Sequence, residues 1–256
     1  MRLSAEIYTE TSPDHEHNED FVLAGSDFVI VLDGASPVPG LENGCIHDVP
    51  WLVRQLGLRL AEGLTAPAAW SLAAILEHAI QQVCDAHADT CDLKDPNSPS
   101  STVALLRLHG DRLDYLALAD SSVVLRMADG GILPITDDRL DHLQDYSVPG
   151  VAAARNTDKG FWVASTKPEA ARHAVSGSIS LAAQPVQAAA VLTDGAATLV
   201  ERHDQSWGSL FSILETGPHE LVRQTREADE TAAGKFRGKR HDDATAVLCH
   251  FVGSQP

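Results

Sequence analysis

The sequence predicts an α+β fold, a four-layer α-β-β-α sandwich in which two antiparallel sheets pack together between outer pairs of helices. Strand-like segments occur at the beginning, in the middle and at the end of the chain. Two helical segments lie between the first and second groups of strands, and two more precede the last strand. Strict alternation of strand and helix is absent, so the pattern favours the sandwich over a doubly wound parallel sheet.

The first half of the chain begins with strands. The segments 3–8, Phe21–Ala24 and the apolar run FVIVL at Phe28–Leu32 have strand-like composition and end at acidic or glycine residues. A loop rich in proline and glycine follows. Apolar residues at helical spacing then predict one helix over 49–63 and a second over about 67–88.

The middle of the chain predicts four short antiparallel strands, TVALLRL, RLDYLAL, SVVLRM and GILPI, separated by turn residues. The segment 139–159 has weak periodicity and belongs to a flap-like insertion at about 139–166. Beyond it we expect a short helix over 167–174, the strand VQAAAVL, two helical segments within 207–233 and the final strand TAVLCHFV. Because no composition shift marks a boundary, we expect one domain over 1–256.

The charge balance limits the possible partners. The chain has 19 Lys and Arg against 36 Asp and Glu, a formal net charge of -17. This charge repels nucleic acids and anionic membranes, so neither is an expected partner. The opening MRLSAEIYTE lacks the apolar segment of a signal peptide, and no apolar run has the length of a membrane span.

The cysteines are too few and too scattered for a disulfide framework, which predicts a cytoplasmic location. None belongs to a CxxC pair, and the spacing of Cys84 and Cys91 is wrong for a zinc knuckle. We therefore expect four free thiols that need no function: Cys45, Cys84, Cys91 and Cys249.

Four aspartates fall at the ends of predicted strands that are far apart in the sequence. Asp20 and Asp242 each precede a strand, and Asp33 and Asp194 each follow one. Strand ends at one end of a sandwich can converge, and ionised carboxylates that share a cleft repel one another unless protons or cations neutralise them. A ligand set made of oxygen atoms favours Mg²⁺ or Mn²⁺ over Zn²⁺.

Each of these aspartates also has an ordinary explanation when taken alone. Asp33-Gly34 and Asp194-Gly195 are common turn dipeptides, as is Asp129-Gly130. Acidic pairs at loop ends are equally common on solvated surfaces. The ordered set carries more weight than any one member.

Six short motifs, taken in order, resemble those of the metal-dependent protein phosphatases, the PPM or type 2C serine/threonine phosphatase family, and indicate a divergent bacterial-type member. The motifs span almost the whole chain. They are NED ending at Asp20, VIVLDG ending at Gly34, SSTV beginning at Ser100, ADSS containing Asp120, TDG containing Asp194 and DDATAV beginning at Asp242.

This resemblance implies two bound cations, Mn²⁺ or Mg²⁺. Asp33 would bridge them, the Gly34 carbonyl would ligate one, Asp194 and Asp242 would complete the other, and Asp20 would act directly or through water. Asp120 is the family's candidate ligand for a weaker third cation. Asp33 and Asp20 are accordingly the predicted catalytic residues, in a mechanism in which a hydroxide bridging two cations attacks the phosphorus in line.

The chain also departs from the family's pattern. The arginine that usually binds the substrate phosphate would fall at about His15, which makes His15 the predicted substrate-binding residue. An imidazole cannot form the two parallel hydrogen bonds with which an arginine holds a phosphate. The GSTA-like motif has Ser100 in place of its glycine, and the GDSR-like motif has lost both its glycine and its arginine. Other basic residues are candidates for the missing charge: Arg139, Arg155, Lys159 and the cluster within 235–240.

Three interpretations follow. The first is a phosphatase that acts on phosphoserine or phosphothreonine in proteins, or on a small phosphate ester. The second is a catalytically weak binding or regulatory module that keeps the phosphatase fold, which the departures from the family's motifs support. The third is a sandwich in which the aspartates only form turns.

Overall fold

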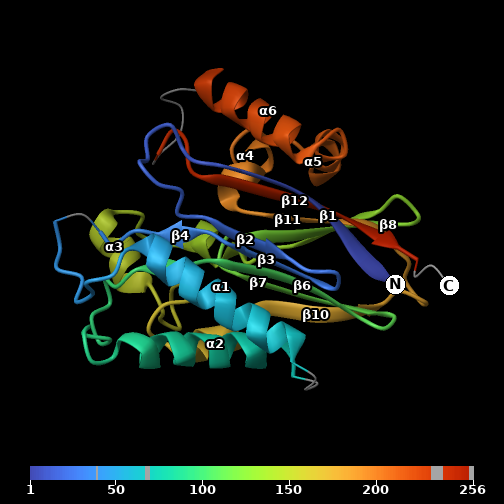
Figure 1. Cartoon of the computed structure of the whole chain (residues 1–256). Coiled ribbons are helices and arrows are strands. Elements are labelled where there is room, and N and C mark those ends of the chain that lie inside the picture. Colours follow the sequence, from blue (N-terminus) through green and yellow to red (C-terminus); the bar gives the residue numbers. More distant parts are fainter. Residues whose placement is uncertain (39, 67–69, 232–238, 254–256) are drawn as a thin grey trace.

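The computed structural model describes residues 1–38, 40–66, 70–231 and 239–253. Two five-stranded antiparallel sheets lie face to face, and helices cover the outer face of each sheet (Figure 1). The predicted α+β sandwich of two antiparallel sheets is therefore confirmed.

The first sheet contains both the first and the last strand of the chain, in the order β1-β12-β11-β8-β9. Every neighbouring pair is antiparallel. Its strands are β1 (Arg2–Glu10), β12 (Ala244–Val252), β11 (Val186–Leu192), β8 (Ser122–Met127) and β9 (Ile132–Ile135).

The second sheet has the order β10-β7-β6-β3-β2, again antiparallel throughout. A separate two-stranded ladder, β4-β5, lies beyond the end of β3. The strands are β10 (Val175–Ser180), β7 (Arg112–Leu118), β6 (Val103–His109), β3 (Phe28–Leu32), β2 (Phe21–Ala24), β4 (Gly34–Ala35) and β5 (Ser100–Ser101).

Two helices cover the second sheet, α1 (Val49–Thr65) and α2 (Leu72–His87). The Asp48 side chain caps α1 by accepting the N–H of Trp51 at 2.8 Å, which satisfies one of the free donors of the first turn. The second helix begins later than predicted, and 67–69 lie outside the described residues.

Three helices cover the first sheet, α4 (Asp194–Glu201), α5 (Trp207–Leu214) and α6 (Pro218–Thr231). The last two correspond to the segments predicted within 207–233, of which 232–233 lie outside the described residues. The sequence does not predict α4, because the first residues of this helix form an Asp-Gly pair that is typical of turns.

The centre of each sheet is apolar on both faces because each sheet lies between another sheet and a helix layer. In β3, Phe28, Ile30 and Leu32 pack toward α1 and α2, whereas Val29 and Val31 pack against the other sheet. This double burial explains why FVIVL is an uninterrupted apolar run rather than an alternating one.

The flap-like segment contains two helical turns that the sequence analysis did not predict, the 3₁₀ helix Asp138–His142 and α3 (Val148–Ala154). Val151 and Ala154 pack against the buried Phe161 and Val163, so apolar contacts hold part of this segment in place. The short helix expected after Pro168 is present as a 3₁₀ turn, followed by the edge strand β10, whose sequence VSGSIS has weak strand propensity.

The loops that carry the predicted ligands belong to one end of the sandwich. In Figure 1, β4, α3 and the loop before α1 lie at the end opposite to the two termini. None of the described helices is long and apolar enough to cross a membrane.

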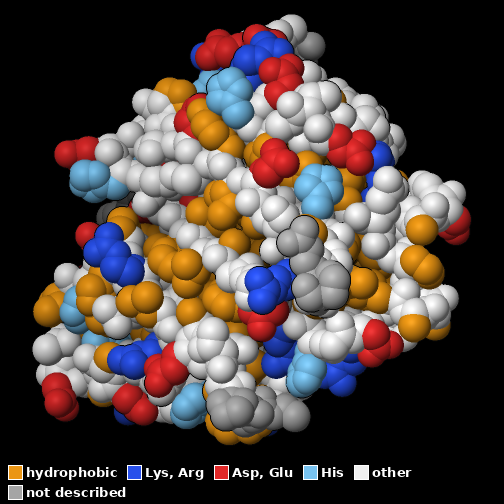
Figure 2. Space-filling model, turned by 45° about the vertical axis from the view of Figure 1, so that its right-hand side comes forward, with side chains coloured by type: hydrophobic (Ala, Val, Ile, Leu, Met, Phe, Trp, Pro, Cys, Tyr) orange, Lys and Arg blue, Asp and Glu red, His pale blue; other side chains and the backbone are white. Residues whose placement is uncertain are grey.

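One face of the molecule has mixed charge. In Figure 2, acidic and basic side chains are scattered over this face, and hydrophobic side chains cross its middle. The described basic side chains seen there do not merge into a continuous patch, in keeping with the net charge of -17.

Candidate metal centre

The predicted ligands come from five different connections of the sandwich. Asp20 directly precedes β2, and Asp33 lies between β3 and β4. Asp120 lies in the turn between β7 and β8, Asp194 is the first residue of α4, and Asp242 precedes β12. All five side chains are half-buried. The fold thus collects five carboxylates from positions that are far apart in the chain.

The five carboxylates lie near enough to one another for the charges of some to raise the pKa values of others. Burial raises the pKa of Asp33 well above its ordinary range, and the charges of Asp194, Asp20, Asp120 and Asp242 raise it further. Burial likewise raises the pKa of Asp120 to about 7, with Asp194 and Asp242 adding to the effect. A cluster of this kind is stable at neutral pH only when protons or cations reduce its charge.

Two threonine hydroxyls fix the position of Asp20. Thr245 donates to Oδ2 of Asp20 at 2.6 Å and Thr193 donates to the same atom at 3.2 Å. The N–H of Thr245 in turn donates to Oγ1 of Thr193 at 2.9 Å, so the ends of β11 and β12 orient this carboxylate together. Burial nevertheless raises the pKa of Asp20 well above its ordinary range.

The two Asp-Gly pairs serve close packing rather than turns. A Cβ atom on Gly34 would overlap Val49 and lie 2.5 Å from the carbonyl oxygen of Glu19, and one on Gly195 would overlap the carbonyl oxygen of Asp243. Neither glycine has a positive φ. Because neither glycine has a side chain, a second segment of the chain can pass close to it. The segment beside Gly34 leads to Asp20, and the segment beside Gly195 leads to Asp242.

This packing corrects the turn interpretation of the two Asp-Gly pairs. Gly34 brings together the segments of Asp20 and Asp33, and Gly195 those of Asp194 and Asp242. The third pair differs, since Gly130 has a φ of 87° and forms a turn as expected.

Asp243 is a site residue that the sequence analysis did not identify. It is buried, and its carboxylate accepts the N–H of Ser12 at 2.7 Å and the N–H of Glu19 at 2.6 Å. Nδ1 of His15 lies 3.3 Å from the same carboxylate. Asp243 therefore anchors the loop that carries His15 and Asp20, and the only signal in the sequence was its place beside Asp242.

The basic side chain of Lys239 lies against the acidic cluster. Nζ of Lys239 lies 3.2 Å from Oδ1 of Asp242. Burial lowers the pKa of Lys239, but the charges of Asp242, Glu19 and Asp33 outweigh that effect and raise it above its ordinary value. Lys239 belongs to the basic cluster identified from the sequence, of which 235–238 lie outside the described residues.

The basic residues of the flap have other contacts. Arg139 binds the carboxylate of Asp137, with Nε 2.7 Å from Oδ1. Arg155 donates to the carbonyl oxygen of Ser98 at 3.3 Å, and Lys159 is exposed. Arg139 and Arg155 therefore support the fold of the flap.

The acidic cluster fits a hard divalent cation. Within the described part of the chain, Oδ1 of Asp20 and Oδ1 of Asp194 are buried without a hydrogen-bond partner. Buried oxygen atoms of this kind are costly unless something binds them, and a carboxylate set without nitrogen or sulfur suits Mn²⁺ or Mg²⁺. Gly34, whose carbonyl is also a predicted ligand, is buried beside Asp33 and pairs with Ser101 across the β4-β5 ladder.

Comparison with known proteins agrees with the fold and with the order of the motifs. The family model described as "Protein phosphatase 2C" matches residues 14–226. No match was found among curated proteins.

Solved bacterial phosphatases have a similar fold. The serine/threonine phosphatase PstP/Ppp of Mycobacterium tuberculosis is 15% identical with a TM-score of 0.65, covering 99% of this chain and 100% of that one. Stp1 of Staphylococcus aureus is 14% identical with a TM-score of 0.63, covering 98% and 96%. The catalytic domain of PstP solved with two manganese ions is 16% identical with a TM-score of 0.61, covering 98% and 99%.

Removing one charge from the acidic cluster should stabilise the metal-free protein. The pKa of Asp120 is raised to about 7 in the folded protein. Below about pH 4 this carboxyl is protonated in both the folded and the unfolded chain, and as the pH rises through 7 its ionisation lowers the stability of the folded protein. The loss amounts to about 4 kcal/mol. We expect Asp120→Asn to raise the thermal midpoint of the metal-free protein at pH 8 by several degrees, and by less at pH 5.

Thermal unfolding in the presence of a chelator measures this effect. Asp129→Asn is the matched control, because Asp129 is an exposed turn residue. An Asp120→Asn protein that unfolds at a lower temperature than the wild type at pH 8 would show that repulsion among the carboxylates does not limit the stability of the metal-free protein.

The glycine behind Asp194 should be required for both stability and metal binding. In Gly195→Ala, the new methyl group meets the carbonyl oxygen of Asp243, and the chain must move apart there. We expect a loss of about 1–3 kcal/mol in the free energy of unfolding together with weaker Mn²⁺ binding. Gly208→Ala is the control, since its Cβ meets nothing closer than 3.8 Å. Equal behaviour of the two variants in urea unfolding and Mn²⁺ titration would contradict the close-packing role.

Proposed function

The chain belongs to the protein phosphatase 2C family, and on this basis we propose that it is a metal-dependent phosphatase whose substrates are phosphoserine and phosphothreonine in proteins. The observation that carries the proposal is the convergence of Asp20, Asp33, Asp194 and Asp242 from separate connections into one cluster of mutually repelling carboxylates. A fold that only needed turns at these positions would have no reason to accept that repulsion.

We propose that the cluster holds two cations, Mn²⁺ or Mg²⁺. Asp33 would contact both, together with the carbonyl of Gly34, and Asp20, Asp194 and Asp242 would complete the set. Asp120 is the proposed ligand of a third cation. When bound, the cations would supply an activated water and neutralise charge on the phosphate. The two manganese ions in the structure of the PstP catalytic domain support this choice of metal.

The protein's own contribution is to hold the carboxylates in place before the metals bind. The carbonyl oxygen of Asp33 accepts the N–H of Thr102 at 2.9 Å, which fixes the backbone at the end of β3. Thr193 and Thr245 hold Asp20, and Asp243 anchors the loop that leads to it. Pre-organisation of this kind matters because phosphoryl transfer depends mainly on positioning and charge stabilisation.

We propose that Lys239 and His15 bind the substrate phosphate in place of the family's arginine. Lys239 is a cation beside Asp242, so a phosphate bound to metals at the cluster would lie within its field. Nδ1 of His15 faces Asp243, so Nε2 is the nitrogen left for the phosphate, and it can donate to the phosphate only when the imidazole is protonated. Neither residue reproduces the two parallel hydrogen bonds of an arginine.

A second candidate function is a catalytically weak binding or regulatory module. It is favoured by a specific observation, the engagement of Arg139 with Asp137 through both Nε and Nη2, which occupies the pair of donors that would clamp a phosphate. A small phosphate ester is the alternative substrate for the active enzyme. A cytoplasmic location is also proposed, supported by four cysteines that are not joined in disulfides.

Metal-dependent hydrolysis is the direct test. We expect the purified protein to hydrolyse an aryl phosphate and a phosphothreonine peptide when Mn²⁺ is present and not when it is chelated. Asp33→Asn and Asp194→Asn should each lower kcat/KM by more than about 100-fold, since each removes a carboxylate on which metal binding depends. Asp129→Asn should leave kcat/KM unchanged.

Two outcomes would overturn parts of this proposal. Mn²⁺ binding without turnover of either substrate would favour the binding module. Failure to bind Mn²⁺ or Mg²⁺ in calorimetric titrations would exclude a metal-dependent activity at this cluster. Turnover of the aryl phosphate alone would favour a small phosphate ester as the substrate.

The proposed phosphate contacts predict an effect on KM. Lys239→Ala should raise KM for the phosphopeptide by about tenfold with little change in kcat, because a half-exposed charge mainly affects substrate binding. His15→Ala should act in the same direction. Arg240→Ala is the control for Lys239, since Arg240 pairs with the exposed Glu230. Equal KM values for Lys239→Ala and Arg240→Ala would remove Lys239 from the substrate site.

A further inference from the structure

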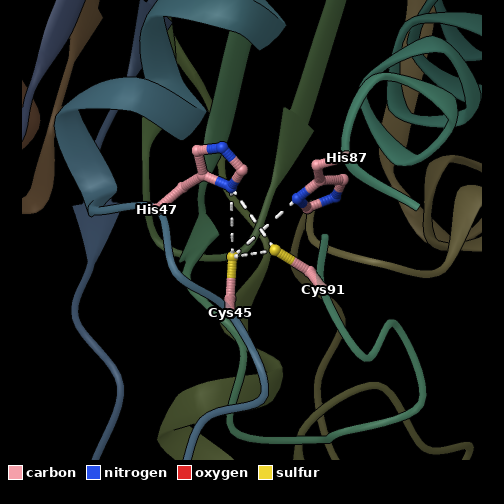
Figure 3. Close-up of side chains that lie close together, drawn as sticks. All are labelled: Cys45, His47, His87 and Cys91. Carbon is pink, nitrogen blue, oxygen red and sulfur yellow. Dashed lines mark hydrogen bonds between the residues drawn. The ribbon is translucent and has the colours of Figure 1, made fainter. Parts of the chain in front are cut away.

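Four side chains of metal-binding type converge outside the acidic cluster (Figure 3). Cys45 and His47 lie in the loop before α1, His87 is the last residue of α2, and Cys91 follows it. One ligand atom from each residue lies within 4.8 Å of all the others. Among the described residues, no other group of three or more His, Cys, Asp or Glu side chains brings its ligand atoms this close together, the carboxylates of the acidic cluster included.

Four of the six separations, at 3.3–3.8 Å, are close to those between the corners of a zinc tetrahedron, and the other two are within 4.8 Å. Sγ of Cys45 lies 3.8 Å from Nδ1 of His47 and 3.8 Å from Nδ1 of His87. Sγ of Cys91 lies 3.4 Å from Nδ1 of His47 and 3.3 Å from Sγ of Cys45. Ideal Zn–S and Zn–N bonds in a tetrahedron place neighbouring ligand atoms about 3.4–3.8 Å apart.

We propose that Cys45, His47, His87 and Cys91 form a structural zinc site. Two thiolates and two imidazoles are a ligand set typical of Zn²⁺, and they differ in kind from the carboxylates of the acidic cluster. Four protein ligands fill a tetrahedral coordination shell, so this site leaves no position for a substrate or a reactive water. Its role is therefore structural rather than catalytic.

The surroundings hold the ligands in the required orientation. The ring of His47 stacks on Trp51 with centroids 3.9 Å apart and an interplanar angle of 22°. The ring of His87 lies against the same indole at 5.2 Å.

A disulfide between Cys45 and Cys91 is the main alternative for this geometry. The two sulfur atoms are 3.3 Å apart, whereas a disulfide bond requires about 2.05 Å. A disulfide would also give no reason for the Nδ1 atoms of both histidines to face the sulfurs. The geometry of all four residues together is that of a metal site.

The zinc would tie together the segment that follows Asp33-Gly34 and the segment that leads into β5. The loop with Cys45 and His47 follows the Asp33-Gly34 pair, and the segment after Cys91 leads into β5. The two segments also contact each other directly, since the N–H of Asp92 donates to the carbonyl oxygen of Gly44 at 2.8 Å. They meet again where Gly34 pairs with Ser101. Bound zinc would therefore stabilise the loops beside the acidic cluster without being part of that cluster.

Metal content and cobalt spectroscopy test the site without reference to activity. After dialysis into metal-free buffer with a phosphine reductant, the wild type should retain about one zinc per chain by elemental analysis. Replacement of zinc by Co²⁺ should give the charge-transfer absorption of cobalt bound to thiolates. Cys45→Ser and Cys91→Ser should weaken zinc binding by more than the roughly 10- to 100-fold that loss of an outer contact costs.

Matched variants separate this site from the acidic cluster and from the other thiols. Cys84→Ala should keep the zinc, because Cys84 is not one of the four grouped side chains and its sulfur instead contacts the carbonyl oxygen of Ser165. Asp33→Asn should also keep the zinc, and in that background a chelator should lower the thermal midpoint. If the serine variants do not fold, the wild type's zinc content and cobalt spectrum still decide the question.

Three results would overturn the zinc site. One is a reduced, folded wild type that retains no zinc and shows no cobalt-thiolate absorption. Another is equal zinc retention by Cys45→Ser, Cys91→Ser and Cys84→Ala. The third is a Cys45–Cys91 disulfide, found by peptide mapping, in protein purified without a reductant and without zinc.

Discussion

Mutual repulsion among the carboxylates at one end of the sandwich is the constraint on which the rest of the structure depends. Burial and neighbouring charges raise the pKa values of Asp20, Asp33, Asp120 and Asp194, so the fold keeps these groups together against their own electrostatics. The stability needed for this comes from three apolar layers, one between the sheets and one under each set of helices. A site that is strained without its ligand is a common feature of metal centres, because the ligand removes the strain when it binds.

The layers and the motif positions could be predicted because they follow from periodicity and from short local patterns. The run FVIVL indicates a strand buried on both faces, and the family-like motifs place their aspartates at the ends of predicted strands. Long-range partners leave no such pattern. Asp243 and Thr245 were missed because their function arises only when β12 lies beside β11 and the 12–19 loop folds over it. The helix α4 was missed because its Asp-Gly start is ambiguous until the close approach of Asp243 is known.

The Cys–His group shows the same limit more clearly. Its two halves are C-x-H before α1 and H-x₃-C, which begins at the last residue of α2. Neither half has a standard zinc spacing, and Cys45 and Cys91 are 46 residues apart. The antiparallel packing of α1 and α2 brings the start of one helix near the end of the other, and this places the halves together. The two groups would select different kinds of cation, because Zn²⁺ prefers the thiolates of the Cys–His group and Mn²⁺ or Mg²⁺ prefers the carboxylates of the acidic cluster.

How the protein holds a phosphate follows from what its charges can and cannot do. A chain with a net charge of -17 repels an anionic substrate at long range, so under the proposed function the attraction would come from cations at the cluster itself. Lys239 supplies a point charge beside Asp242 but not the planar pair of donors that an arginine offers. Orientation of the phosphate would then rest on bound metals more than on side chains. Such a site binds phosphate only when its metals are present, so metal supply would control substrate affinity as well as turnover.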